Sequence, residues 1–210
     1  MQCNSRYISH KLSSFGHNFD KMSSYSLLLI SGGLFLIILI VGNCGAKRKW
    51  DYEPLSIDTY SSDESKLKFV AKVERVARGE FAIGGTIDFK YTPDSNTMVE
   101  AVAHRSSSGA ESDYKQIPLT IPKQPFADFM NTHYKDLVIP NLGKCSNLIQ
   151  FEDEFDGVWP QQVYTLDKCV ADSDGFPEMV PEGFYRVNFT VTNPVDWGFV
   201  LVVKISTKLM

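Results

Sequence analysis

The stretch that decides the fold reads Phe176-Pro-Glu-Met-Val-Pro-Glu-Gly-Phe-Tyr-Arg-Val-Asn-Phe-Thr-Val-Thr192. Its second half alternates in a way typical of a half-buried strand, because successive side chains of a strand point to opposite faces. Pro177 and Pro181 cannot donate to a sheet ladder, so the strand is expected to begin after them. The apolar face of this strand takes Tyr185, Val187, Phe189 and Val191.

A second alternating strand follows the turn at Asn193-Pro194. The pattern therefore predicts an antiparallel pair with one aromatic and aliphatic face, which must pack against another layer. The apolar face of the second strand takes Trp197, Phe199, Leu201, Val203 and Ile205.

Short turns separate further alternating segments, which predict strands at 66–74, 81–91 and 98–104 and shorter ones at 114–117 and 163–169. Gly84-Gly85 indicates a bulge or a bend. Residues 50–65 are polar and acidic and give no strong prediction. Short turns between strands favour a meander or Greek-key all-β architecture.

One helix interrupts the strands. Pro125 suits the first helical position, and Pro140 is expected to end the pattern. The residues spaced on one helical face are Phe126, Phe129, Met130, His133 and Leu137.

Residues 1–46 are expected to be a signal peptide with a polar extension, which leaves a secreted domain of residues 47–210. From Met22, itself a candidate start, to Ala46 there is no charged residue. The apolar run 27–41 is shorter than the roughly 20 residues of a spanning helix. The small residues before Lys47 suit a cleavage site. The alternative is a membrane anchor through residues 27–41.

Charge and motifs narrow the function classes. The net charge is −4, with +2 on residues 1–46 and −6 on the remainder, which argues against nucleic-acid binding. After Ala46 only His104 and His133 remain, and neither lies near a hydrolase or zinc motif. We therefore expect no enzyme, cofactor or metal site. The acidic run 152–156 is interpreted as a solvated loop.

Cleavage after Ala46 would remove Cys3 and Cys44 and leave Cys145 and Cys169. In a secreted domain such a pair predicts one disulfide, and two free thiols are the alternative. Asn188-Phe-Thr190 is a glycosylation sequon, and Asn188 falls on the polar face of its strand. We therefore expect a glycan on Asn188.

Several short motifs, in order, resemble a family. They are Pro122-Lys-Gln-Pro-Phe126, Lys144-Cys-Ser-Asn147, Trp159-Pro160, Phe176-Pro177, Pro181-Glu-Gly-Phe-Tyr-Arg186 and Asp196-Trp-Gly-Phe199. From about Trp50 onward the chain resembles the fly chemosensory A family, secreted proteins related to the ML lipid-recognition family and the ganglioside activator protein. Relatives outside the chemosensory group often have Cys-Pro where this chain has Cys169-Val170.

The resemblance implies an immunoglobulin-like, ML-type antiparallel β-sandwich of two sheets with one helix, holding an apolar small molecule or lipid. It also implies a role in perceiving pheromones or other cuticular lipids, with a membrane receptor as a further candidate partner. The alternatives are a secreted or tethered adhesion or receptor-accessory domain with a packed core, and an unrecognised enzyme. The candidate lining is Phe69, Phe89, Phe126, Phe129, Tyr185, Phe189, Phe199 and Leu201.

Overall fold

The computed structural model describes residues 49–171 and 176–208, which belong to one compact unit, Arg48–Met210. The expected signal segment, with its apolar run 27–41, its cleavage site and Cys3 and Cys44, lies outside the described residues. Within the described part, no helix has both the length and the apolar character needed to cross a membrane.

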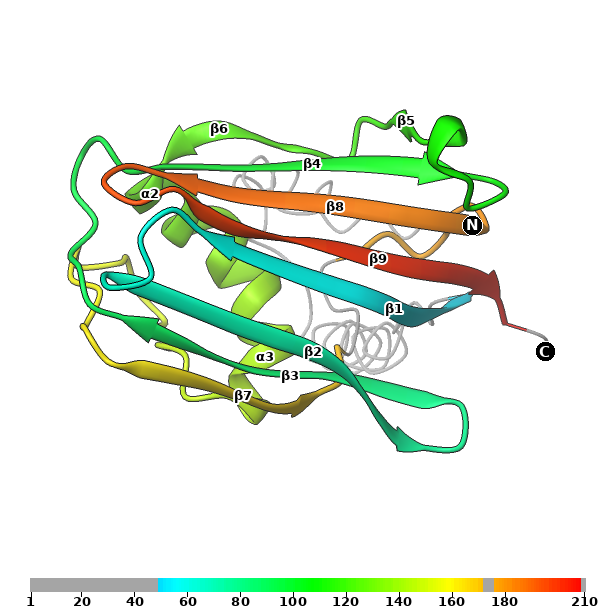
Figure 1. Ribbon diagram of the computed structural model, residues 1–210, viewed down its shortest axis with the longest axis horizontal. Coiled ribbons are helices and arrows are strands. Elements are labelled where there is room, and N and C mark those ends of the chain that lie inside the picture. The colour runs from blue at the N-terminus through cyan, green and yellow to red at the C-terminus, as the bar shows by residue number, and fades with distance from the viewer. Residues whose placement is uncertain (1–48, 172–175, 209–210) are drawn as a thin grey trace, which may run out of the picture. The chain divides into compact units, whose positions relative to one another are not determined.

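Two antiparallel sheets form a β-sandwich, as predicted (Figure 1). The larger sheet has the order β1–β9–β8–β4–β5, with β6 also paired to β4, and the smaller sheet has the order β2–β3–β7. The strands are β1 (Trp50–Ser61), β2 (Leu67–Ala77), β3 (Glu80–Phe89), β4 (Met98–Ser106), β5 (Lys115–Gln116), β6 (Ile121–Pro125), β7 (Val163–Cys169), β8 (Gly183–Thr192) and β9 (Trp197–Thr207).

The antiparallel pair predicted on either side of the Asn193-Pro194 turn is confirmed. β8 pairs with β9 in a regular antiparallel register that places Phe189 opposite Phe199 and Val191 opposite Trp197. The apolar faces predicted for the two strands therefore coincide. The predicted bulge also appears in β3, where the pairing with β7 shifts register between Ile83 and Gly85.

Strand β1 was not predicted. Its polar composition hides any alternation, and Pro54 argues against a strand interior. The structure accommodates Pro54 because β1 is an edge strand and its register with β9 shifts between Pro54 and Ser56. Proline is tolerated at edges and bulges, where a missing N–H breaks no ladder bond.

Strands β1 and β2 bring the two sheets together along one side (Figure 1). The Thr59 hydroxyl donates to the backbone carbonyl of Phe69, at 2.8 Å. Figure 1 shows the helical segment behind these strands.

The helical segment runs further than expected. It consists of α2 (Phe126–Phe129), η3 (Met130–Val138) and α3 (Ile139–Leu142), followed by η4 (Gly143–Cys145). The prediction that Pro140 ends the helix is wrong. Pro140 lies in the first turn of α3, where its missing N–H is tolerated. The preceding η3 is wound as a π-helix, and the N–H of Ile139 bonds to the carbonyl of Tyr134.

The wider winding also changes the buried face. Phe126, Phe129 and Met130 are buried as predicted. The next fully buried side chain is Tyr134, whereas His133 and Leu137 are only half-buried. The helix therefore supplies Tyr134 as an additional aromatic ring, which the predicted face did not include.

The Pro181–Arg186 motif forms a corner at the start of β8. The Tyr185 hydroxyl donates to the Pro181 carbonyl at 2.6 Å, and the Arg105 guanidinium donates to the Glu182 carbonyl. Gly183 has φ +140°, and a Cβ there would lie 2.7 Å from the Ser106 carbonyl oxygen. Only glycine satisfies both conditions without strain.

The predicted disulfide joins Cys145 to Cys169, which ends β7. Next to it, the Asn147 amide nitrogen donates to the Val163 carbonyl at 3.0 Å, and its amide oxygen accepts from the Thr165 N–H at 2.6 Å. The Lys144–Asn147 motif therefore anchors the end of the helical segment to the edge of β7.

Candidate functional site

The largest hydrophobic cluster lies where the inner faces of both sheets meet the helical segment. It draws on β2, β3, β4, β7, β8 and β9, on the helix and on the loop before β7. Its fully buried members are Leu67, Phe89, Tyr91, Val99, Phe126, Phe129, Met130, Tyr134, Trp159, Tyr164, Val191, Val195 and Trp197.

Six of the eight predicted lining residues meet in this region through ring contacts. Phe89, Phe126 and Phe129 are buried, and Phe69 and Phe189 pack against them half-buried. Phe199 stacks on Phe189, with ring centroids 5.1 Å apart, and meets Phe69 of the opposite sheet at 6.2 Å. The alternation along the strands thus predicted correctly that Phe69, Phe189 and Phe199 face the same interior region.

The other two predicted lining residues lie apart from this network. Tyr185 is buried in a second cluster with Trp50 and Ile205. Leu201 pairs in register with Ile57 and Val187 and is half-buried. The structure therefore divides the predicted lining between two packed clusters and Leu201, which belongs to neither and is half-buried.

Several apolar side chains on the inner faces are not fully buried. On the larger sheet they include Ile57, Val187 and Leu201, and on the smaller sheet Ala71, Val73 and Ile83. Register places Leu201 opposite Ile57 and Val187, and Val73 opposite Ile83, while Ala71 lies opposite Gly85. Interiors without voids leave such side chains fully buried. These side chains therefore keep part of their apolar surface accessible at this level.

Buried polar groups in the large cluster are mostly paired with each other or with the backbone. The Trp197 indole donates to the Tyr91 hydroxyl at 2.8 Å, and the Tyr134 and Tyr164 hydroxyls donate to the carbonyls of Ile149 and Pro160 at 2.7 Å. Burial raises the pKa of Tyr91 to about 12, and it also raises the pKa of Tyr134 and of Tyr164. These phenols are therefore neutral at physiological pH.

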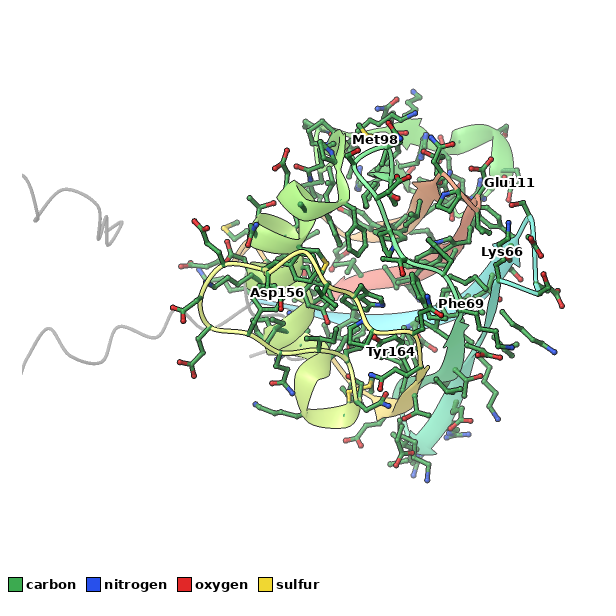
Figure 2. The ribbon with its side chains drawn as sticks, turned by 90° about the vertical axis from the view of Figure 1, so that its left-hand side faces the viewer. Lys66, Phe69, Met98, Glu111, Asp156 and Tyr164 are labelled. Atoms are coloured by element: carbon green, nitrogen blue, oxygen red, sulfur yellow. A yellow bond between two sulfur atoms is a disulfide. The ribbon has the colours of Figure 1, made fainter. Side chains whose placement is uncertain are left out.

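The loop between Ile149 and Pro160 borders a hollow of about 440 Å³. Phe151 and Phe155 line it, and their rings contact Tyr134 and Phe126 respectively. The acidic residues 152–154 and Asp156 are exposed, as predicted. Figure 2 shows the loop that carries Asp156 beside the helical segment, with Phe69 and Tyr164 on the sheets.

The helix holds this loop. The Lys135 ammonium donates to the carbonyls of Glu152 and Asp153, and the Asn131 side-chain oxygen accepts from the Phe155 N–H at 2.7 Å. Among the described residues there is no group of three or more His, Cys, Asp or Glu that could hold a metal ion.

The two remaining histidines lie on different elements. His104 is on β4, in register with Arg186 and Gln116. His133 stacks on Phe129, and its Nδ1 lies 3.1 Å from the Gln124 amide and 2.9 Å from the Thr132 hydroxyl. His133 is thus held between β6 and the helix by these contacts.

Asn188 is half-buried on the outer face of β8, opposite the inward Val187 and Phe189. It lies in register with Val102 on β4 and Val200 on β9. Its side-chain oxygen is buried without a hydrogen-bond partner. Asn188 is therefore less exposed than the alternation alone suggested.

Sequence reasoning missed Tyr91, Tyr134, Phe151, Phe155 and Trp159 as site residues. Most of them lie in loops, where no periodicity marks an inward side chain. The Trp159-Pro160 pair was noticed only as a motif, yet Trp159 contacts four rings of the cluster. A loop tryptophan beside proline was the one available signal.

A family model described as "Protein of unknown function (DUF1091)" matches residues 99–187, which is less than half of the chain. The matched span runs from β4 into β8 and includes the helical segment, the disulfide, the loop of the hollow and the Pro181–Arg186 corner. No curated protein matches the chain.

Proposed function

We propose that the protein is a secreted, non-enzymatic carrier that binds a lipid or another apolar small molecule between its two sheets. The observation that carries the proposal is the half-buried apolar side chains on both inner faces, around Leu201, Val187 and Ile83. Binding sites for such molecules are concave and mostly apolar.

The physical basis for binding is the burial of apolar area. Each Å² of apolar surface removed from water contributes about 25 cal/mol. An acyl chain against Leu201 and Val187 would gain this energy on both sides, from the ligand and from the protein. The disulfide between Cys145 and Cys169 supports an oxidising, extracellular compartment. Protein sequencing that found residues 27–41 retained in the secreted product would argue for the membrane-anchored alternative.

A chemosensory role, with perception of a pheromone or taste compound, follows from the resemblance to the fly chemosensory A family. In this role the protein would present its ligand to a membrane receptor and would bind no nucleic acid. The net charge of −4 supports the last point, because nucleic-acid binding needs a basic face.

The test is uptake of a fluorescent fatty-acid probe by the wild type and by Leu201→Trp. The larger side chain should fill the space between the sheets, and we expect uptake to fall at least tenfold with little loss of stability. Val202→Trp is the matched control, because Val202 lies on the same strand but on the outer face. It should leave uptake unchanged.

The proposal fails if the wild type shows no saturable binding to fatty acids, esters or hydrocarbons. That outcome would favour the adhesion or receptor-accessory alternative. The observation that supports this alternative is the continuous network of ring contacts from Phe69 through Phe199 and Phe189 to Phe129. Such a network is typical of a packed core rather than of an open lining.

A further inference from the structure

Trp159 has a buried indole N–H with no hydrogen-bond partner. The residue lies in the loop before β7 and is only 7% exposed. Its ring lies among Tyr164, Tyr134, Phe126 and Phe89, at centroid distances of 5.1, 5.5, 5.9 and 6.2 Å. An N–H in these surroundings has lost water without gaining an acceptor.

Five other aromatic side chains in the two clusters donate to acceptors. Trp50 donates to the Pro177 carbonyl, Trp197 to the Tyr91 hydroxyl, Tyr134 to the Ile149 carbonyl, Tyr164 to the Pro160 carbonyl and Tyr185 to the Pro181 carbonyl. Of the three tryptophans, all of which the structure describes, Trp159 is therefore the one whose indole N–H has no acceptor. A buried donor left alone in this way is costly, and it calls for an acceptor that the protein does not supply.

The surroundings restrict the chemistry of that acceptor. Two of the rings around the indole are phenylalanines, and the other two are tyrosines whose hydroxyl protons go to backbone carbonyls. An ionised carboxylate would be strongly disfavoured there, because it would lose its hydration and meet no opposite charge. A neutral oxygen, as in an ester, ketone or alcohol, accepts from an indole N–H without that cost.

The position of Trp159 also suits a ligand. Both of its chain neighbours, Val158 and Pro160, line the 440 Å³ hollow together with Phe151 and Phe155. The rings of Phe126 and Tyr134 connect those two phenylalanines to the indole. The indole ring thus lies within the aromatic cluster, one ring away from the two phenylalanines that line the hollow.

We propose that the Trp159 indole N–H is the polar anchor of the interior site, and that the ligand is a neutral oxygenated apolar molecule rather than a plain hydrocarbon. This inference rests on the proposed carrier function. It specifies the chemical class of the ligand and names a single side chain that selects that class.

The experiment compares two probes of equal chain length, methyl tetradecanoate and hexadecane, by displacement of a fluorescent probe from the full chain. We expect Trp159→Phe to bind the ester about tenfold more weakly, which corresponds to about 1.4 kcal/mol, while hexadecane binding is unchanged. Trp50→Phe is the matched control, because it removes an indole N–H from the other cluster. It should change neither affinity.

The outcomes separate the two proposals. A wild type that binds neither probe overturns both. The anchor alone is overturned if the wild type binds both probes and Trp159→Phe binds them equally well. It is also overturned if Trp159→Phe loses the same affinity for both probes, or if the wild type binds hexadecane but not the ester. Should Trp159→Phe fail to fold, the indole proton signals of wild type decide: the Trp159 signal must move on adding the ester and stay in place with hexadecane.

Discussion

Tyr91→Phe tests the hydrogen bond that ties the two sheets together inside the aromatic cluster. Tyr91 follows β3 of the smaller sheet, and Trp197 begins β9 of the larger one. They are 7% and 8% exposed, and the indole N–H donates to the phenol oxygen at 2.8 Å. The substitution keeps the ring stacked on Phe89, at 4.4 Å, but leaves the Trp197 donor unpaired.

The expected loss is about 1–3 kcal/mol, the cost of a buried donor without an acceptor. This is a large share of a typical free energy of unfolding of about 5–15 kcal/mol. Urea titration followed by circular dichroism measures this loss in the free energy of unfolding. The slope of that free energy against urea concentration should stay constant, while the urea concentration at the midpoint of unfolding should fall.

Tyr60→Phe is the matched control for this measurement. The Tyr60 hydroxyl also donates to a side chain, Thr190, at 3.0 Å, but Tyr60 is 42% exposed and water can replace the bond. Its loss should stay within about 0.5 kcal/mol. Equal effects of the two substitutions would refute the reasoning that burial sets the cost.

Two further predictions concern pH and modification. Because burial raises the pKa of Tyr91 from 10.0 to about 12, the unfolded chain ionises first, and stability should fall as the pH rises from about 10 to 12; alkaline unfolding of Tyr91→Phe should show a smaller pH slope. Asn188→Gln should increase gel mobility when the protein is made in a secreting cell, since it removes the sequon, and unchanged mobility would contradict a glycan at this position.

The strands that carried a clear alternation could be predicted from sequence. Each of β8 and β9 has one apolar and one mixed face, and burial of the apolar face fixes the register. β1 could not be predicted, because it is an edge strand with Pro54 at a register shift and has few apolar positions. Its place is set by pairing with β9, which is a contact distant in sequence.

The site was predictable only as far as its residues lie on strands or on the regular start of the helix. Parity placed Phe69, Phe189 and Phe199 correctly in the aromatic network. Tyr134 was left out of the predicted face although it follows Met130 by four residues, and Trp159 was missed because a loop has no repeat. Alternation thus revealed the interior donors Trp197 and Tyr185, which lie on strands, but not Trp159, which lies in a loop.

The Pro181–Arg186 corner says little about the ligand, because its residues are occupied with the corner itself. Gly183 permits the close approach to Ser106, Tyr185 bonds back to Pro181, and Arg186 pairs with Glu111 and lies 4.0 Å above the Tyr114 ring. A chain can therefore share this motif and the sandwich while holding a different ligand or none.

Ligand selection should instead vary with side-chain groups that make no hydrogen bond within the scaffold. Leu201 has no bonding role and is half-buried on an inner face, and the Trp159 N–H is buried without a partner. Substitution at either position leaves the Pro181–Arg186 corner and the Cys145–Cys169 disulfide in place. Relatives that retain the corner but differ at 159 or 201 are therefore expected to keep the fold and change the chemical class that they bind.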